Sequence, residues 1–396
     1  MTTFDELSKE RFQQTIEDRR AHIDAAPATP LPGIHPLNEF AKRLHPNRQY
    51  MKVDAITEID ANTKVFRLVP DPARGTTECA PFIAGQYVNI YLDIEGMQVN
   101  RSYSIASSPK DARDGFYELL IKYVEGGLVS RYVLDNWAEG DEVEISGPAG
   151  AFYYSPIRDA KTVVCLAGGS GITPFRSLAK AIVEGDEDFK LTLLFGSRTE
   201  EQILFRDEFD ALAADDRISV VHVLSDEERE GFENGFITAD LITKYAPADE
   251  PYSVFVCGPQ AMYRFVDVEI EKLGLERKYV RHELFGEVHN PGEMGDYPGG
   301  APDAVKITVS IRDETRTIDG SANDSILQTL EKNGITVPAS CRSGECGFCH
   351  STLVSGKVYV PKAVDGRRRA DLKFGGIHPC VTFPLSDLEI IVPASK

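Results

Sequence analysis

Short strand-like segments, separated by polar turn residues, fill the chain from Met51 to about Ser155. Apolar, β-branched and aromatic residues dominate these segments, which is typical of β-strands. Their short and regular spacing predicts a small antiparallel β-barrel. The clearest segments are Lys64–Val69, Tyr87–Leu92, Phe116–Tyr123 and Glu142–Ile145, and one helical stretch at about Leu128–Trp137 interrupts them.

The pattern changes near Thr162, where short apolar runs begin to alternate with longer helical stretches. The first run, Thr162–Ala167, ends in Gly-Gly-Ser-Gly and leads into a helical segment at Pro174–Val183. Strands that alternate with helices predict a parallel, doubly wound sheet. Later strands are expected at Leu191–Phe195, Ser219–Leu224 and Ser253–Cys257, and helices around Glu201–Ala213, Thr238–Tyr245 and Gln260–Leu273.

Strand-like segments return after a Gly- and Pro-rich stretch at Asn290–Pro302, which is typical of a linker. Val305–Ile311 and Glu314–Ile318 predict a hairpin, and Ser325–Lys332 predicts a short helix. At the N-terminus, a charged helical stretch and a Pro-rich run predict an arm rather than a domain. We therefore expect an arm at residues 1–50, a β-barrel domain at 51–156, an α/β domain at 157–289, a linker at 290–303 and a small C-terminal domain at 304–396.

Composition narrows the class of protein only broadly. The chain has 396 residues and a formal net charge of −19, and 42% of its residues are hydrophobic. This length predicts two to three domains, and the negative charge argues against nucleic acid as a partner. No apolar run reaches eighteen residues, so no membrane span is expected, and the polar start does not resemble a secretory signal. A cytoplasmic protein is expected, in which the seven cysteines favour metal ligation over disulfides.

Four of the cysteines form an array near the C-terminus. Cys341, Cys346 and Cys349 have the spacing C-x4-C-x2-C, and Cys380 follows after thirty intervening residues. This is the plant-type ferredoxin spacing for a [2Fe–2S] cluster. One loop then supplies three thiolates and its backbone N–H groups, and a distant segment supplies the fourth thiolate.

Two other metal sites use similar residue types. Structural zinc sites usually arrange cysteines in C-x2-C pairs, so the array is uncommon among them. A Rieske centre replaces two cysteines with histidines, and His350 and His378 do stand beside ligands. However, four cysteines are already in place, so the [2Fe–2S] interpretation is favoured.

Two segments of the expected barrel carry groups that suit a flavin nucleotide. One motif offers a guanidinium for a phosphate, an aromatic ring for stacking on a flat heterocycle and a hydroxyl for a ring nitrogen. Gly127 and Ser130 stand where the expected helix begins, so N–H groups and a hydroxyl are available for a pyrophosphate. The residues of the first motif are Arg101, Ser102, Tyr103 and Ser104.

Glycines at the ends of two expected strands suit a dinucleotide. They let the backbone approach the ligand, and the following helix presents its N-terminus. Pro174 stands where the dehydrogenase fingerprint G-x-G-x-x-G has its final glycine, so the chain departs from that fingerprint. The candidate residues are Gly169, Gly171, Thr173, Gly258 and Pro259.

In this order, the motifs resemble those of the ferredoxin–NADP reductase superfamily. The chain is similar to its modular members with a C-terminal plant-type ferredoxin domain, such as the reductase components of oxygenases and of hybrid-cluster proteins. The resemblance extends from about Met51 to the end of the chain. It implies an antiparallel β-barrel flavin domain, an α/β doubly wound nucleotide domain and an α+β ferredoxin domain of the β-grasp type.

The resemblance also implies roles for the residues of the flavin motifs. Arg101 would bind the flavin pyrophosphate, and Gly127 and Ser130 would complete that site. Tyr103 would stack on the isoalloxazine ring, and Ser104 would form a hydrogen bond near N5.

On the nicotinamide side, the resemblance places Thr173 beside the nicotinamide and Cys257 close to the point of hydride transfer. Phe285, in His282-Glu283-Leu284-Phe285, would cover the flavin near its reacting face. Ser104, Cys257 and Phe285 are therefore the expected catalytic residues. Core packing is the alternative for Cys257 and Phe285, since both residue types are commonly buried.

The identity of each nucleotide rests on neighbouring residues. Phe152 lies in an aromatic segment where relatives stack an adenine, which favours FAD over FMN. Arg198 offers one cation for a 2′-phosphate, but Asp226 and Glu227 stand where phosphate-binding relatives resemble Ser-Arg. Because two carboxylates would repel a phosphate, NADH is favoured and NADPH stays open.

Together these parts predict a reductase that takes hydride from NADH to FAD and passes single electrons through [2Fe–2S] to a partner redox protein. The flavin is needed because the nicotinamide gives two electrons and the cluster carries one. Two alternatives stay open. One is a self-sufficient oxidoreductase that reduces quinones, ferric chelates or other small acceptors, and the other is a flavin-based redox sensor or interaction module.

Overall fold

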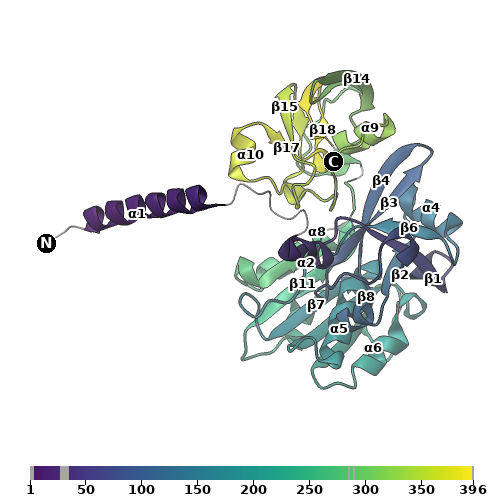
Figure 1. Cartoon of the computed structure of the whole chain (residues 1–396). Coiled ribbons are helices and arrows are strands. Elements are labelled where there is room, and N and C mark those ends of the chain that lie inside the picture. Colours follow the sequence, from purple (N-terminus) through teal and green to yellow (C-terminus); the bar gives the residue numbers. More distant parts are fainter. Residues whose placement is uncertain (1–3, 27–34, 284–285, 289, 395–396) are drawn as a thin grey trace. The chain divides into compact units, whose positions relative to one another are not determined.

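The computed structural model describes residues 4–26, 35–283, 286–288 and 290–394. The chain divides into two compact units, Met1–Leu44 and His45–Lys396. The described part of the first unit contains the helices α1 (Phe4–Ala25) and α2 (Pro36–Leu44) (Figure 1). Helix α2 buries none of its residues. No helix in the described ranges is long and apolar enough to cross a membrane.

The second unit begins with an antiparallel half-barrel of six strands. Their order in the sheet is β4-β3-β6-β1-β2-β5, and every pairing is antiparallel. A bridge between Ile105 and Leu119 joins the end of β4 to β5, which curls the sheet. The strands are β1 (Gln49–Asp60), β2 (Thr63–Pro70), β3 (Tyr87–Ile94), β4 (Met97–Ser104), β5 (Tyr117–Lys122) and β6 (Glu142–Ile145), and the helices are α3 (Pro109–Arg113) and α4 (Leu128–Asn136).

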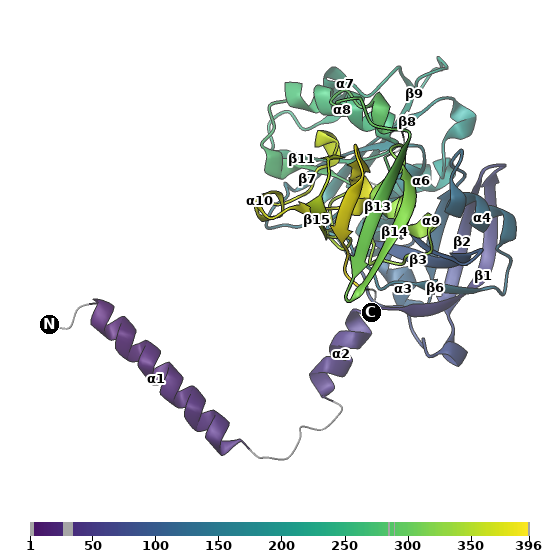
Figure 2. The ribbon, with the colours of Figure 1, turned by 90° about the horizontal axis from the view of Figure 1, so that it is seen from above.

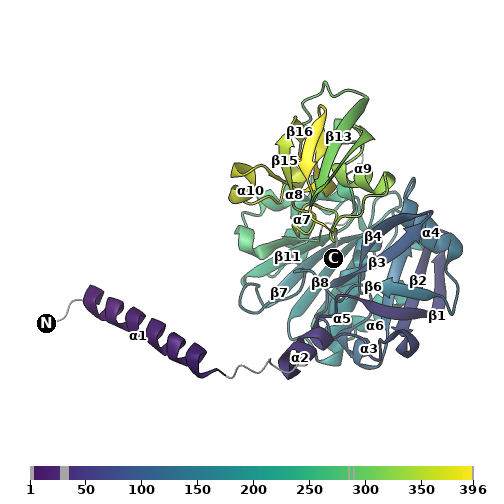
Figure 3. The same ribbon diagram turned by 45° about the horizontal axis from the view of Figure 1, so that its top comes forward.

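A parallel sheet of six strands follows, with the order β10-β9-β8-β7-β11-β12. Every residue of β7 is buried, because helices cover both faces of the sheet. Figure 3 shows β11, β7 and β8 in succession across this sheet. The strands are β7 (Thr162–Gly168), β8 (Lys190–Ser197), β9 (Ile218–Leu224), β10 (Glu233–Asn234), β11 (Tyr252–Cys257) and β12 (Val280–His282), and the helices are α5 (Thr173–Glu184), α6 (Arg206–Leu212), α7 (Ala239–Tyr245) and α8 (Gln260–Lys272).

The strand order of this sheet predicts where a ligand would bind. From β7 the chain moves outward through β8 and β9, and it then returns to add β11 on the other side of β7. In open α/β sheets, ligands bind outside the carboxyl ends of the strands at such a switch point. We therefore expect a ligand crevice where β7 and β11 end, at Gly168 and Cys257.

The C-terminal domain is a mixed sheet with the order β14-β13-β19-β15-β17, in which only β13 and β19 are parallel among its described pairings. In Figure 2, β13 and β14 run side by side as a hairpin. This domain has its own buried core, and the predicted fold class of all three domains is confirmed. The elements are β13 (Ala304–Ile311), β14 (Glu314–Ser321), α9 (Ile326–Lys332), β15 (Ser351–Ser355), β16 (Val358–Tyr359), α10 (Arg369–Lys373), β17 (Gly376–Ile377), β18 (Phe383–Pro384) and β19 (Leu388–Ile391).

Candidate redox site

The four predicted cluster ligands lie in two close pairs. In the loop between α9 and β15, Cys346 N donates to Cys341 Sγ at 3.3 Å and Cys341 N donates to Cys346 Sγ at 3.5 Å. Cys349 and Cys380 form the second pair, with 3.4 Å between their sulfur atoms. None of the four is in a disulfide.

Two pairs of thiols suit a cluster with two iron atoms, each of which needs two protein ligands. A single zinc ion would need all its ligands to converge on one point. Among the described residues, no three ligating side chains converge in this way. The two pairs of thiols therefore fit the [2Fe–2S] interpretation.

The cluster loop turns three times through left-handed backbone conformations. Arg342, Gly344 and Gly347 have φ values of 57°, 87° and 70°. A Cβ at Gly344 would stand 2.3 Å from the carbonyl oxygen of Val364, so only glycine fits there. The turns direct N–H groups toward sulfur, and Ser343 N donates to Cys341 Sγ at 3.5 Å.

Hydrogen bonds inside the loop favour the thiolate form of Cys341, the first predicted ligand. The Cys346 thiol, together with the N–H groups of Ser343 and Cys346, lowers the pKa of Cys341, although burial opposes this effect. His378 Nδ1 lies 2.7 Å from the carbonyl oxygen of Gly344 and therefore braces the loop. His350 faces Asp371 at 3.3 Å. Both histidines have protein partners, in agreement with a four-cysteine site.

Strand β4 carries the predicted flavin motif, and its side chains point in different directions. The guanidinium of Arg101 donates to Asn100 O at 2.8 Å and to Glu287 Oε2 at 3.1 Å. Burial raises the pKa of Tyr103 to about 12, so its phenol stays neutral beside any bound ring. Ser104 is buried at the end of the strand.

Ser102, predicted to contact the flavin, instead faces the cluster loop. Its hydroxyl oxygen is 2.8 Å from Asn89 Oδ1 and 3.0 Å from the carbonyl oxygen of Ser340. Asn89 Nδ2 also donates to Ser340 Oγ at 3.0 Å. Since Ser340 directly precedes Cys341, the flavin strand touches the chain one residue from a cluster ligand.

The predicted phosphate-binding residues Gly127 and Ser130 lie at the start of α4. Gly127 is the N-cap residue of α4, and a Cβ there would stand 2.8 Å from Ser130 Oγ and 2.9 Å from Val124 O. Ser130 Oγ in turn accepts from Val124 N at 3.2 Å. Only glycine fits this close packing at the start of the helix, and the first N–H groups of a helix are the kind of donors that a pyrophosphate needs.

The glycines predicted to bind a dinucleotide lie together at the switch point. A Cβ on Gly171 would be 2.2 Å from the carbonyl oxygen of Cys257, so the loop after β7 touches the end of β11. At Gly258 a Cβ would meet Met262 Sδ at 2.5 Å and Gly168 N at 3.4 Å, so this glycine also lies close to the end of β7. Gly169, with a φ of 52°, turns the loop, and the Thr173 hydroxyl donates to Ser170 O at 2.6 Å. The structure thus brings together residues that the sequence separates by about eighty positions.

Cys257 ends β11 and is 2% exposed. Burial raises the pKa of this thiol far above its usual value, so Cys257 stays protonated. Burial likewise raises the pKa of Glu283, the residue after β12. The Tyr263 hydroxyl donates to the carbonyl oxygen of Glu283 and accepts from Gly258 N at 3.0 Å, which ties β12 to the crevice. Phe285, the third expected catalytic residue, lies outside the described residues.

The two residues predicted to bind at the ribose of the nicotinamide nucleotide form an ion pair. Arg198 follows β8 and Asp226 follows β9, and Arg198 Nε lies 3.0 Å from Asp226 Oδ2. A hydrogen bond from the Ser225 hydroxyl lowers the pKa of Asp226 further, so its carboxylate is charged. The pair neutralises the cation that would otherwise attract a 2′-phosphate.

Phe152, predicted to stack on adenine, packs in a hydrophobic core. Its ring is 5.8 Å from that of Phe175 and 5.2 Å from that of Phe255, and the residue is 2% exposed. This placement favours a packing role for Phe152. Tyr154 also packs, since it stacks on Phe189 at 4.3 Å, whereas neighbouring Tyr153 is only half-buried.

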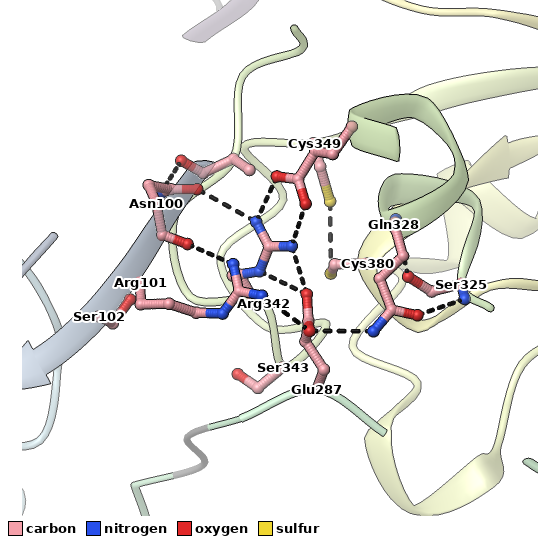
Figure 4. A network of polar contacts seen from close by, with 12 residues as sticks. Asn100, Arg101, Ser102, Glu287, Ser325, Gln328, Arg342, Ser343, Cys349 and Cys380 are labelled. Carbon is pink, nitrogen blue, oxygen red and sulfur yellow. Dashed lines mark hydrogen bonds and ion pairs between the residues drawn. The ribbon is translucent and has the colours of Figure 1, made fainter. Parts of the chain in front are cut away.

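The predictions from sequence did not include the residues that join the cluster loop to the flavin strand. Figure 4 shows a polar network around Arg342 and Glu287 that reaches Asn100 and Arg101 on β4. Both Arg342 and Glu287 are ordinary charged residues in the sequence. Only their burial, at 1% and 5% side-chain exposure, marks them.

Three protein-family profiles match the chain. They are described as an oxidoreductase FAD-binding domain at residues 50–154, an oxidoreductase NAD-binding domain at residues 165–267 and a 2Fe-2S iron-sulfur cluster binding domain at residues 309–385. Each match falls on one of the three sheets described above.

Curated proteins and solved structures are similar to the chain over most of its length. The ferredoxin reductase component of 3-ketosteroid-9-alpha-monooxygenase from Rhodococcus rhodochrous is 30% identical over 349 residues, which cover 85% of this chain and 94% of that protein. The glycine betaine monooxygenase reductase subunit of Pseudomonas aeruginosa is 27% identical, over 78% of this chain and 87% of that protein. Phthalate dioxygenase reductase superposes with a TM-score of 0.64 and 25% identity, over 88% of this chain and 98% of that structure.

Proposed function

Because the chain belongs to the ferredoxin–NADP-reductase-like proteins that join an FAD-binding, an NAD-binding and a C-terminal [2Fe–2S] domain, we propose that it serves a terminal oxygenase as its reductase component. The chain is an NADH-dependent oxidoreductase that uses FAD and a [2Fe–2S] cluster. The oxygenase as electron acceptor is inferred from relatives whose names describe reductase parts of monooxygenases. We also expect the protein in the cytoplasm, where thiol ligands stay reduced.

One observation supports the electron route most directly. The flavin strand β4 and the cluster loop share hydrogen bonds, at 3.0 Å between Ser102 and Ser340 and at 2.8 Å between Asn100 and Ala339. Ser340 is bonded to Cys341, so the proposed flavin and cluster sites are neighbours within one compact unit. Electron transfer inside one polypeptide needs such proximity.

Each proposed site has residues suited to its task. Arg101, Gly127 and Ser130 would hold the pyrophosphate, Tyr103 would stack on the ring and Ser104 would bond near N5. When bound, the flavin accepts a hydride and releases electrons singly, which matches a two-electron donor to a one-electron cluster.

The nicotinamide nucleotide would lie across the switch point. The glycine backbones let it approach β7 and β11, and Thr173 would lie by the nicotinamide. Because burial raises the pKa of the Cys257 thiol, this side chain is not a thiolate nucleophile. It would instead pack against the nicotinamide ring. Asp226 would meet the ribose hydroxyls. The backbone contacts along the crevice would come from Gly169, Gly171, Gly258 and Pro259.

The test uses the purified protein loaded with FAD and cluster. Anaerobic NADH is expected to bleach the flavin absorption first and then the cluster absorption, and the reduced cluster should give an electron paramagnetic resonance signal. A protein acceptor such as cytochrome c should then be reduced only when the cluster is present. Equally fast reduction of a quinone or a ferric chelate by cluster-free protein would support the self-sufficient alternative.

A further inference from the structure

One buried carboxylate connects the flavin strand, the cluster loop and helix α9. Glu287 lies beyond β12, and its side chain is 5% exposed. Its Oε1 accepts from Arg342 Nε at 2.6 Å, and its Oε2 accepts from Arg101 Nη2 at 3.1 Å and from Gln328 Nε2 at 3.0 Å. Figure 4 shows Glu287 where these three side chains meet.

Arg342 is the residue after the first cluster ligand, and its guanidinium is fully used. Nε and Nη2 donate to Glu287, Nη1 donates to Asn100 Oδ1 at 3.2 Å, and Nη1 and Nη2 donate to Glu331 at 2.7 and 2.6 Å. A guanidinium has five N–H donors, and each has an acceptor here. The loop backbone at Arg342 is left-handed, with a φ of 57°, so these contacts hold a conformation that costs energy in their absence.

The charges in this cluster balance. Two arginines, Arg101 and Arg342, face two carboxylates, Glu287 and Glu331. Burial alone would raise the pKa of Glu287, but the charges of Arg342 and Arg101 outweigh it and lower that pKa to about 2. Glu287 is therefore a carboxylate, and each of its oxygens accepts hydrogen bonds from charged or amide donors.

We propose that Glu287 is a positioning residue that couples the two redox sites: it orients the guanidinium of Arg101 toward the flavin pyrophosphate and, through Arg342, seats the cluster loop on strand β4. This inference rests on the flavin role proposed above for Arg101. Within the described residues, Arg101 spends two of its five N–H groups on Asn100 O and Glu287, and the others remain for a phosphate.

The test is Glu287→Gln in the holoprotein, since glutamine keeps the size but removes the charge. We expect the dissociation constant for FAD, measured by flavin fluorescence, to rise about tenfold, because Arg101 loses the charged partner that orients its guanidinium. In anaerobic stopped flow, cluster reduction should slow about tenfold relative to flavin reduction. The rate of flavin reduction by NADH should stay near the wild-type rate at saturating FAD.

Glu331→Gln is the matched control, because it removes a carboxylate from the same arginine inside the ferredoxin domain without touching Arg101. It should leave FAD affinity at the wild-type value. Equal shifts of FAD affinity in both variants, or wild-type FAD affinity in Glu287→Gln, would overturn the proposal.

Arg342→Lys provides a second measurement should Glu287→Gln fail to accumulate with its cluster. It keeps the charge but loses the forked contacts. Slower cluster reduction with unchanged FAD affinity is expected, and unchanged cluster reduction would contradict the proposal. If the wild-type protein itself shows no transfer from NADH to the cluster, the proposed function fails, and not the role of Glu287.

Discussion

The first cluster ligands lie close together in sequence, but Cys380 reaches the site only through folding. It sits 3.4 Å from Cys349 in a short turn before β18. Its spacing to the other three cysteines made it a predicted ligand, because a remote fourth thiolate is part of the plant-type array. By contrast, nothing in the sequence distinguished Ser102 from Ser104, since the facing of each hydroxyl depends on the twist of β4 and its neighbours.

Replacing this remote ligand should separate the two redox centres. We expect Cys380→Ser to lose most iron and sulfide and the visible absorption of the cluster, because a serine hydroxyl is a poor substitute for a thiolate. NADH should still reduce the flavin, which stopped-flow absorbance would show. Cys79→Ala, at a buried cysteine outside the array, should keep its iron. Full iron content in Cys380→Ser would rule out this residue as a ligand.

A single added methyl group should test the crevice. In Gly171→Ala, the new Cβ would meet the carbonyl carbon and oxygen of Cys257 at 2.4 and 2.2 Å, so backbone must move. We expect a loss of about 1–3 kcal/mol in unfolding free energy and a higher KM for NADH. Urea unfolding measures the unfolding free energy, and steady-state kinetics measure the KM for NADH. Gly196→Ala, whose Cβ would meet Ala167 O at 3.5 Å, should behave as wild type.

At the scale of elements, we predict that the residues after β8 and β9 determine the choice between NADH and NADPH. Asp226→Ala removes the carboxylate and leaves Arg198 without its 3.0 Å partner. The ratio of kcat/KM for NADH over NADPH should therefore fall about tenfold, or about 1.4 kcal/mol. Glu228→Ala removes an equal charge from the same loop and should leave the ratio unchanged. A ratio that changes equally in both variants would indicate a general charge effect.

A buried ion pair joins the segment after the half-barrel to β12. Arg281 contacts both oxygens of Asp159, and it also donates to Ala151 O and Tyr153 O at 3.0 Å. Because Asp159→Asn would leave this guanidinium short of a counter-charge, we expect about 3–5 kcal/mol of destabilisation in urea unfolding. Asp188→Asn, at an exposed pair with Lys161, should change the midpoint little. A small effect of Asp159→Asn would show that water compensates Arg281.

Most of the longer helices and strands could be predicted from the sequence, whereas the shortest strands could not. The strands β2, β3 and β6 and the helix α4 were predicted within a few residues, because each buries a clear apolar face. The strands β10 and β12, of two and three residues, carry too few positions to show a pattern. Phe152 shows a second limit, since an aromatic residue near a binding segment can as well fill a core.

For the whole molecule, sequence patterns locate the parts but not the contacts between them. Asn89 and Ser340 are 251 residues apart and 3.0 Å from each other, and Glu287 and Arg342 are 55 residues apart and 2.6 Å from each other. Such pairs depend on how domains meet, which no local periodicity encodes. The joining network was therefore found only in the structure.

The division of the chain into two units yields a prediction for truncation. A protein of residues 45–396 should keep FAD, cluster and the wild-type rate of cluster reduction by NADH, because the compact second unit holds all matched domains. Removing residues up to 52 should abolish FAD binding, since Gln49 is 1% exposed and bonds Ala80 N and Ser146 O. The FAD and iron content of the two truncated proteins, and their rates of cluster reduction in stopped flow, would be compared. Loss of activity in the protein of residues 45–396 would show that the first 44 residues have a role.

The amide of Gln328 has two partners at once. Its oxygen accepts from Ser325 N at 2.9 Å to close the start of α9, and its nitrogen donates to Glu287. A glutamate is an equally good choice for the first task in an isolated helix. Here it would place two carboxylates against each other in a buried setting, so a substitution that looks silent by local rules would push α9 away from the segment that carries Glu287.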